Sequence, residues 1–188
     1  MEAFLLSTAV IFLAELGDKS QLMALTFASR FPARTVLLGI TIATAVVHLA
    51  SVVLGAAVGV TLPTTAISIL AGLAFFGFAA WTLRGDSLTE DERTKVQRAT
   101  GQALLVIGTT FFLAELGDKT MLATITLATD NGLVGTWVGS TVGMVIADAL
   151  AIGAGLALGR RLPDKVVRYG AAAAFAVFGV LLIWRGLS

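Results

Sequence analysis

Six stretches of mostly apolar residues follow one another along the chain, and they constrain the fold more than any other feature. They cover residues 4–28, 36–60, 64–83, 102–129, 133–159 and 165–184. The hydrocarbon core of a bilayer is about 30 Å thick, so a helix of roughly 20 apolar residues crosses it. Hydrophobic residues make up 57% of the chain and charged residues only 13%, which is not typical of a soluble domain. The sequence therefore predicts an all-α integral membrane protein with six transmembrane helices.

Basic residues between these stretches or near their ends are concentrated in alternate connections. They are Arg30 and Arg34, then Arg84, Arg93, Lys95 and Arg98, and then Arg160, Arg161, Lys165 and Arg168. The connections at residues 60–64 and 130–133 contain no lysine or arginine. Basic loops of membrane proteins remain in the cytoplasm, so we expect both termini outside. The first apolar stretch has no basic region before it, so we expect it to be retained and not cleaved as a signal peptide.

One octapeptide, FLAELGDK, occurs at residues 12–19 and again at residues 112–119. At the same offset, Leu22 matches Leu122, Thr26 matches Thr126, Gly39 matches Gly139, Thr41 matches Thr141 and Gly55 matches Gly155. We therefore predict two homologous halves, residues 1–83 and 101–188, joined by a charged linker at 84–100. Each half has three spans, an odd number, so the halves must be inverted repeats (3+3). Such repeats are characteristic of secondary transporters.

Each octapeptide places two acids in an apolar stretch, namely Glu15 and Asp18 in the first and Glu115 and Asp118 in the second. A carboxylate at the centre of a bilayer costs at least about 2.5 to 3.5 kcal/mol, so these side chains must face the protein interior. If each helix is regular, both acids and the following lysine, Lys19 or Lys119, lie on one face. Inverted symmetry brings the two faces together, and we interpret the acids as ligands of a hard divalent cation.

Several neighbours extend this candidate site. Gly17 and Gly117 permit local unwinding that exposes backbone carbonyls, and Ser20, Gln21 and Thr120 offer neutral oxygen ligands. His48 and Asp148 occupy equivalent positions in the two halves and are candidates for further ligands or a proton relay. An alternative interpretation pairs Glu15 with Lys19, and Glu115 with Lys119, as ion pairs that hold the halves together. A mixed interpretation, in which the lysines partly neutralise the acids when no ion is bound, is preferred.

The hexapeptides ELGDKS and ELGDKT at 15–20 and 115–120 resemble the E-x-G-D-(K/R)-(S/T) signature of the Gdt1-type cation/proton antiporters. That family includes Golgi and chloroplast calcium and manganese transporters and the bacterial manganese exporters named MneA. The resemblance covers essentially the whole chain, and it implies export of Mn²⁺ or Ca²⁺ in exchange for protons with the motif acids as ligands. The short linker resembles the bacterial members, so the expected location is the inner (plasma) membrane. His48 is not part of the signature.

The main hypothesis is a secondary antiporter that exports Mn²⁺ against inward protons and alternates access around the four acids. The metal is then a substrate, no cofactor is expected, and the partners are the ion, protons and lipid. No nucleic-acid partner is expected, although the net charge of +1 says nothing about nucleic acid, and the sequence does not indicate an oligomeric state. Two alternatives remain, an exporter of amino acids or other organic solutes and an intramembrane metalloenzyme. We do not expect an enzyme, because no serine, histidine and acid arrangement accompanies the carboxylates.

Overall fold

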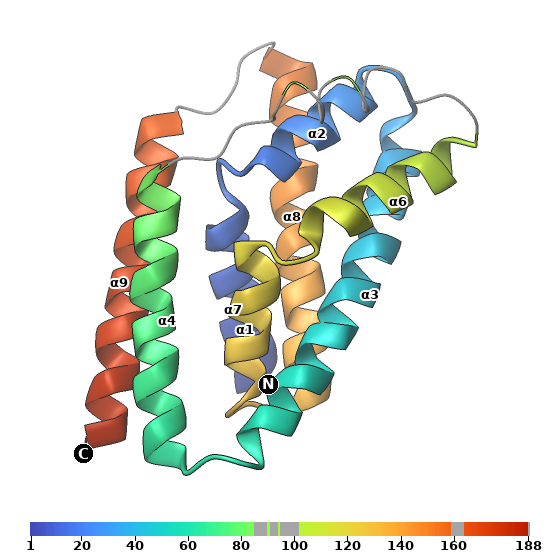
Figure 1. Ribbon diagram of the computed structural model, residues 1–188. Helices are drawn as coiled ribbons and strands as arrows, with labels where there is room; N and C mark the ends of the chain where they lie inside the picture. The colour runs from blue at the N-terminus through green and yellow to red at the C-terminus, as the bar shows by residue number, and fades with distance from the viewer. Residues whose placement is uncertain (85–89, 91–93, 95–101, 159–163, 188) are drawn as a thin grey trace.

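The computed structural model describes residues 1–84, 90, 94, 102–158 and 164–187. Within these residues the chain forms eight helices and no strand (Figure 1). The helices are α1 (Glu2–Glu15), α2 (Lys19–Ala28), α3 (Ala33–Gly59), α4 (Thr64–Arg84), α6 (Ala103–Glu115), α7 (Lys119–Ala128), α8 (Leu133–Leu158) and α9 (Asp164–Leu187). Most of the predicted linker lies outside the described residues, as do Arg93, Lys95, Arg98, Arg160 and Arg161.

Four of these helices are long and apolar enough to cross a bilayer unaided: α3, α4, α8 and α9. Their bounds agree to within a few residues with four of the predicted stretches, because continuous apolar sequence sets both the length of each helix and its position. Many large apolar side chains on them are exposed, including Leu38, Ile42, Leu73 and Leu150. Such surfaces suit lipid as the surrounding solvent. The chain is thus an all-helical, multi-pass membrane protein.

The other two predicted stretches, 4–28 and 102–129, are not continuous helices. The first is divided into α1 and α2, and the second into α6 and α7, in each case after the glutamate of the octapeptide. The condition of one regular helix through each motif therefore does not hold, and the helix is interrupted at the glycines for which the sequence allowed local unwinding. A single glycine in an apolar run is usually tolerated inside a helix, which is why the apolar pattern alone did not reveal the break.

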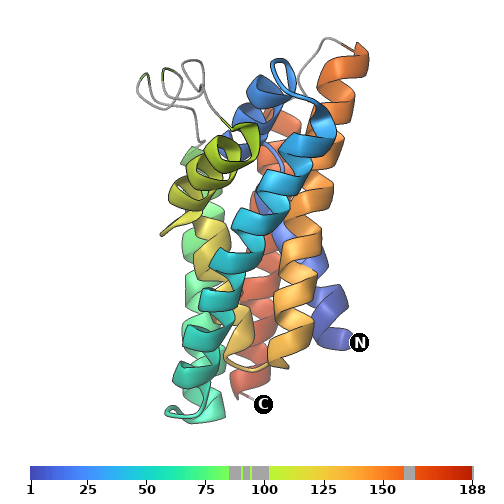
Figure 2. The same ribbon diagram turned by 90° about the vertical axis from the view of Figure 1, so that its right-hand side faces the viewer.

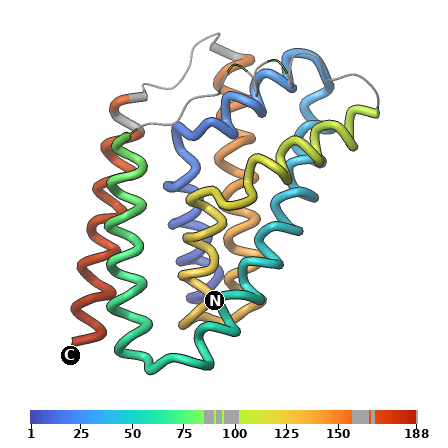
Figure 3. Tube along the Cα trace, in the orientation of Figure 1, coloured from blue at the N-terminus to red at the C-terminus, as the bar shows by residue number. Residues whose placement is uncertain are grey.

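Corresponding helices of the two halves run in opposite directions, and the two termini lie at the same end of the molecule (Figures 1 and 2). The halves interlock, because α1 and α2 pack on α8 of the second half while α6 and α7 pack on α3 of the first. The third helices of the two halves, α4 and α9, pack along each other at one side (Figure 3). This exchange of partners places the two octapeptides together in the centre of the molecule.

Glycines in α3 and α8 allow the close approach of the opposite half. A Cβ atom on Gly55 would lie 2.3 Å from the carbonyl oxygen of Ile125, and one on Gly139 would lie 2.4 Å from that of Phe4. Both neighbours are backbone atoms, which cannot rotate away. Close packing at these glycines therefore holds α3 and α8 against the opposite half.

Replacing Gly139 by alanine is expected to lower the stability of the protein, because the backbone of α1 must move away from α8. Overpacking of this kind costs about 1 to 3 kcal/mol. The matched control is Gly153→Ala in the same helix, where a Cβ would meet nothing within 4 Å; there the helix propensity of alanine favours a gain of up to about 1 kcal/mol. Thermal unfolding in detergent measures both, and equal effects at the two positions would contradict this packing.

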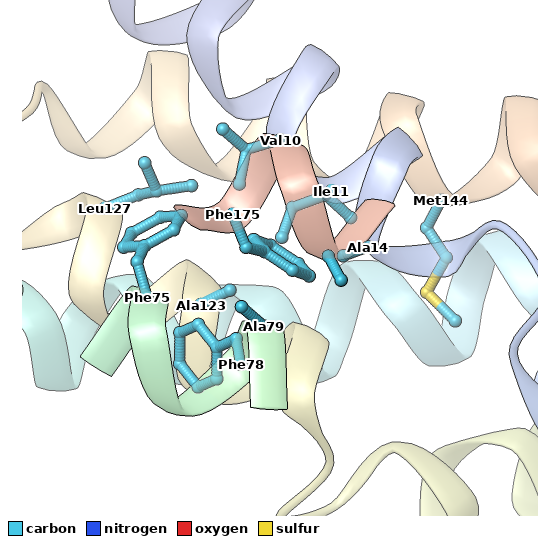
Figure 4. Close-up of a cluster of buried hydrophobic side chains, with 11 residues drawn as sticks. Val10, Ile11, Ala14, Phe75, Phe78, Ala79, Ala123, Leu127, Met144 and Phe175 are labelled. Carbon is cyan, nitrogen blue, oxygen red and sulfur yellow. The ribbon is translucent and has the colours of Figure 1, made fainter. Parts of the chain in front are cut away.

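A cluster of buried apolar side chains joins α1, α4, α7, α8 and α9 (Figure 4). Its aromatic members are Phe75 and Phe78 of α4 and Phe175 of α9, with the partly buried Phe178 packed against them. A second cluster joins α2, α3, α6 and α8 around Phe27 and Phe111. Of these two clusters, α4 and α9 contribute to the first only. They therefore pack against α1 and α7, which are the parts of the two broken segments that lie nearer the chain termini.

Candidate functional site

The two octapeptides form helix breaks of nearly the same geometry. In the first, Leu16 is extended at the end of α1 and Gly17 adopts a φ of +75°. In the second, Leu116 is again extended and Gly117 has a φ of +79°. Backbone in this left-handed region is strained for residues that carry a Cβ, which explains why glycine stands at both positions. Each break places its glutamate at the end of one helix and its aspartate at the start of the next.

Hydroxyl groups bridge each break. Ser20 donates a hydrogen bond to Oε1 of Glu15, and Thr120 donates one to Oε2 of Glu115 at 2.8 Å. All four side chains are buried. The same contact is thus built twice from residues five apart in the sequence. A hydroxyl that donates its hydrogen retains lone pairs, so Ser20 and Thr120 can still offer oxygen to an ion.

An ion pair connects the two motifs. The ammonium group of Lys119 pairs with Oδ1 of Asp18 in the other half, and the exposed fractions of these side chains are only 4% and 0%. The alternative in which Lys119 pairs with Glu115 of its own motif is therefore wrong for this structure. Lys19 lies within electrostatic range of Asp118, which is the equivalent cross-half relationship. Each lysine is thus near the aspartate of the opposite motif.

The four motif acids converge from the two halves. All are buried. Glu15 lies within electrostatic range of Glu115, and Asp18 within range of Asp118, so their charges repel when both members of a pair are ionised. Yet in the part of the chain that the structure describes, no three acidic or histidine side chains are gathered closely enough to hold a metal ion. Asp18 is instead paired with Lys119, and the two glutamates accept hydrogen bonds from Ser20 and Thr120.

His48 and Asp148, which occupy equivalent positions in the two halves, are fully buried. His48 lies in α3 and Asp148 in α8. Neither ring nitrogen of His48 and neither carboxylate oxygen of Asp148 has a hydrogen-bond partner among the described residues. Asp148 lies within electrostatic range of Asp18, Glu15 and Glu115. It is therefore a fifth acid beside the four motif carboxylates.

Gln21, which the sequence suggested as a ligand, uses both ends of its amide within the protein. Its Oε1 accepts the backbone N–H of Gly17 at 2.8 Å, and its Nε2 donates to the carbonyl of Ala147 at 3.1 Å. The Gln21–Ala147 hydrogen bond and the Lys119–Asp18 ion pair were not predicted, because both join residues about a hundred positions or more apart. The duplication itself was the available signal, since inverted repeats bring equivalent residues together across the axis that relates them.

Comparisons with known proteins agree on one family. The model of the family described as "Divalent cation/proton antiporter GDT1" matches residues 3–90 and 103–188. A GDT1-like protein of Synechocystis is 30% identical, with all of both chains covered. A Vibrio cholerae protein named "Putative manganese exporter" is 29% identical over 96% of this chain and 90% of its own.

A chloroplastic GDT1-like protein of rice is 32% identical over 94% of this chain. The match covers 59% of the length of that rice protein, so the chain spans little more than half of it. No solved structure matches the chain.

Proposed function

Because the chain belongs to the GDT1 family of divalent cation/proton antiporters, which are transporters and not enzymes, we propose that it exports Mn²⁺ from the cytoplasm in exchange for protons. The observation that carries this proposal is the buried contact between the two motifs, in which Lys119 of one half neutralises Asp18 of the other. In a site where a metal ion displaces a protein cation, the lysine neutralises the carboxylate while the metal is absent. The name of the Vibrio relative adds support for manganese.

The proposed topology has six crossings in two inverted halves, residues 1–83 and 101–188. Each broken segment, α1–α2 or α6–α7, counts as one crossing beside the four long helices. Arg84 ends α4 at the end of the molecule where α2 joins α3 and where α9 begins (Figure 1). By the positive-inside rule that end is cytoplasmic, and both termini are outside. The membrane is proposed to be the inner (plasma) membrane.

The ion is proposed to bind between Glu15, Asp18, Glu115 and Asp118. Four carboxylates against two lysines leave negative charge that a divalent cation neutralises. Binding requires Lys119 to leave Asp18 and requires the glutamates to turn from their hydroxyl donors, with Ser20 and Thr120 then free to add neutral oxygens. The extended residues of the breaks can present carbonyls, as interrupted helices do in other transporters.

Protons are proposed to compete with the metal at the same carboxylates. A proton arriving from outside neutralises a carboxylate and weakens its attraction for the ion, which then leaves; loss of the proton to the cytoplasm restores the site. Asp148, whose two carboxylate oxygens have no hydrogen-bond partner among the described residues, is proposed to relay protons or to add a ligand. His48 holds the equivalent place in the first half and is proposed for the same roles.

Manganese is preferred over calcium for a chemical reason. An all-oxygen site suits either ion, whereas an imidazole such as that of His48 favours a transition metal. Magnesium dehydrates reluctantly and is expected to be the poorest substrate.

Uptake into proteoliposomes tests the proposal. With an imposed pH gradient, purified protein is expected to move Mn²⁺ faster than Ca²⁺ and to move Mg²⁺ least, and collapse of the gradient with an ionophore is expected to stop net accumulation. A pH-sensitive dye inside the vesicles should report protons moving in the opposite direction. Transport of amino acids without any divalent ion would instead support an organic-solute exporter and would overturn the proposal.

A further inference from the structure

The residue four positions after each motif glycine accepts that glycine's backbone N–H. Gln21 does so with its amide oxygen for Gly17, at 2.8 Å. Met121, the equivalent residue of the second half, does so with its sulfur for Gly117, at 3.1 Å. An amide oxygen is a good acceptor and a thioether sulfur a weak one. The hydrogen bond to the motif glycine is therefore weaker in the second half than in the first.

Only the first half adds a second bond at this position. Nε2 of Gln21 donates to the carbonyl of Ala147 in α8, directly before Asp148. By the repeat, the equivalent acceptor for position 121 is the carbonyl of Val47 in α3, directly before His48. A methionine side chain has no donor, so it cannot make that bond. The first break is tied to the opposite half at a point where the second break is not.

Packing around the two breaks differs in the same sense. Leu116 in the second break is 46% exposed, and a Cβ on Gly117 would meet nothing within 4 Å. Leu16 in the first break is only partly exposed, and Gln21 beside it is buried. The greater exposure of Leu116 and the weaker hydrogen bond to Gly117 both leave the second break easier to rearrange.

We propose that Gln21 is a positioning residue that fixes the first break against α8, and that Met121 leaves the second break as the part of the site that changes shape. The role of the two breaks in transport rests on the proposed function, whereas the difference in rigidity between them does not. Ion exchange then proceeds by movement of Leu116, Gly117 and Asp118 relative to a fixed first half.

Hydrogen–deuterium exchange of the full-length protein in nanodiscs, with no metal present, tests the structural content directly. In the wild type, peptides that cover 116–118 are expected to exchange faster than those that cover 16–18. Gln21→Met keeps an acceptor for Gly17 but loses the donor to Ala147, and it is expected to speed exchange of 16–18 about fivefold. Met121→Gln is expected to slow exchange of 116–118, and Met121→Leu, which adds no donor, is expected not to slow it.

Transport by the same variants tests the consequence. Met121→Gln ties the moving break and is expected to lower kcat for Mn²⁺ while KM changes little. Gln21→Met loosens the fixed half and is expected to raise KM. Equal exchange of the two breaks in the wild type, or no change of exchange in either variant, overturns the inference even if Mn²⁺ transport is observed. If exchange follows the expected pattern but the wild type moves no divalent ion, the proposed function fails and the structural inference stands.

Discussion

Replacing Asp18 by asparagine is expected to abolish Mn²⁺ transport and to destabilise the protein. The variant leaves the ammonium group of Lys119 buried beside a neutral amide, where it has lost its ion-pair partner. Removal of one partner from a buried ion pair costs about 3 to 5 kcal/mol. Transport is lost separately, because asparagine cannot supply the negative charge that attracts a divalent ion. Thermal unfolding and vesicle transport measure the two effects independently.

The double variant Asp18→Asn/Lys119→Met separates stability from function. Methionine has nearly the length of lysine but no charge, so neither member of the ion pair is left charged without its partner, and the stability is expected to return towards that of the wild type. Transport is expected to remain absent, because the acid is still missing. A single variant that transports normally would contradict the role of Asp18. A double variant as unstable as the single one would show that the ion pair is not the cause of the loss.

Truncation of the aromatic residues between α4 and α9 is expected to have the largest effect of any apolar substitution. The ring centroids of Phe75 and Phe175 lie 5.8 Å apart. The centroid of Phe75 also lies 5.6 Å from that of Phe78 and 6.0 Å from that of Phe178. Phe75 and Phe175 are buried and join the α4–α9 pair to α1 and α7. Phe75→Ala leaves a cavity and is expected to cost about 3 kcal/mol, at the lower end of the range for soluble cores because lipid is as apolar as this cluster.

The neighbouring phenylalanine of the same helix is the matched control. Phe76 is 37% exposed and lines an open groove with Val180 and Trp184 of α9, where lipid can replace a lost ring. Phe76→Ala is expected to lower the unfolding temperature much less than Phe75→Ala or Phe175→Ala. If all three variants lose similar stability, the cluster between the helix pair and the centre does not hold these helices in place.

The helical fold follows from the sequence wherever apolar residues run without interruption. The bounds of α3, α4, α8 and α9 were predicted to within a few residues, since length and hydropathy decide them. The breaks at Gly17 and Gly117 were not predicted as helix ends, although Asp18 and Asp118 are good N-cap residues followed by helix formers. The apolar pattern continues through both glycines, so hydropathy does not show that their backbone adopts a positive φ.

The burial of the four motif acids was predictable from the sequence, but the pairing of Lys119 was not. Local spacing favours Glu115 with Lys119, whereas the structure pairs Lys119 with Asp18 of the other half. The repeat offset identified His48 and Asp148 as equivalent, and the structure adds that Asp148 lies among the motif acids. The same offset relates Phe75 to Phe175 and Phe78 to Phe178, and it relates Gln21 to Met121. Comparing the two halves position by position is therefore the signal that finds contacts near the axis between them.

The number of ions bound per chain tests most directly whether the two octapeptides form one site. Purified protein is titrated with Mn²⁺ while electron paramagnetic resonance measures the concentration of the free ion. The titration is expected to give one bound ion per chain. Glu15→Gln in the first half and Glu115→Gln in the second are each expected to remove that binding, since both halves contribute to it. Two ions per chain in the wild type, with one retained in each variant, would contradict the account and would show that each octapeptide binds an ion by itself.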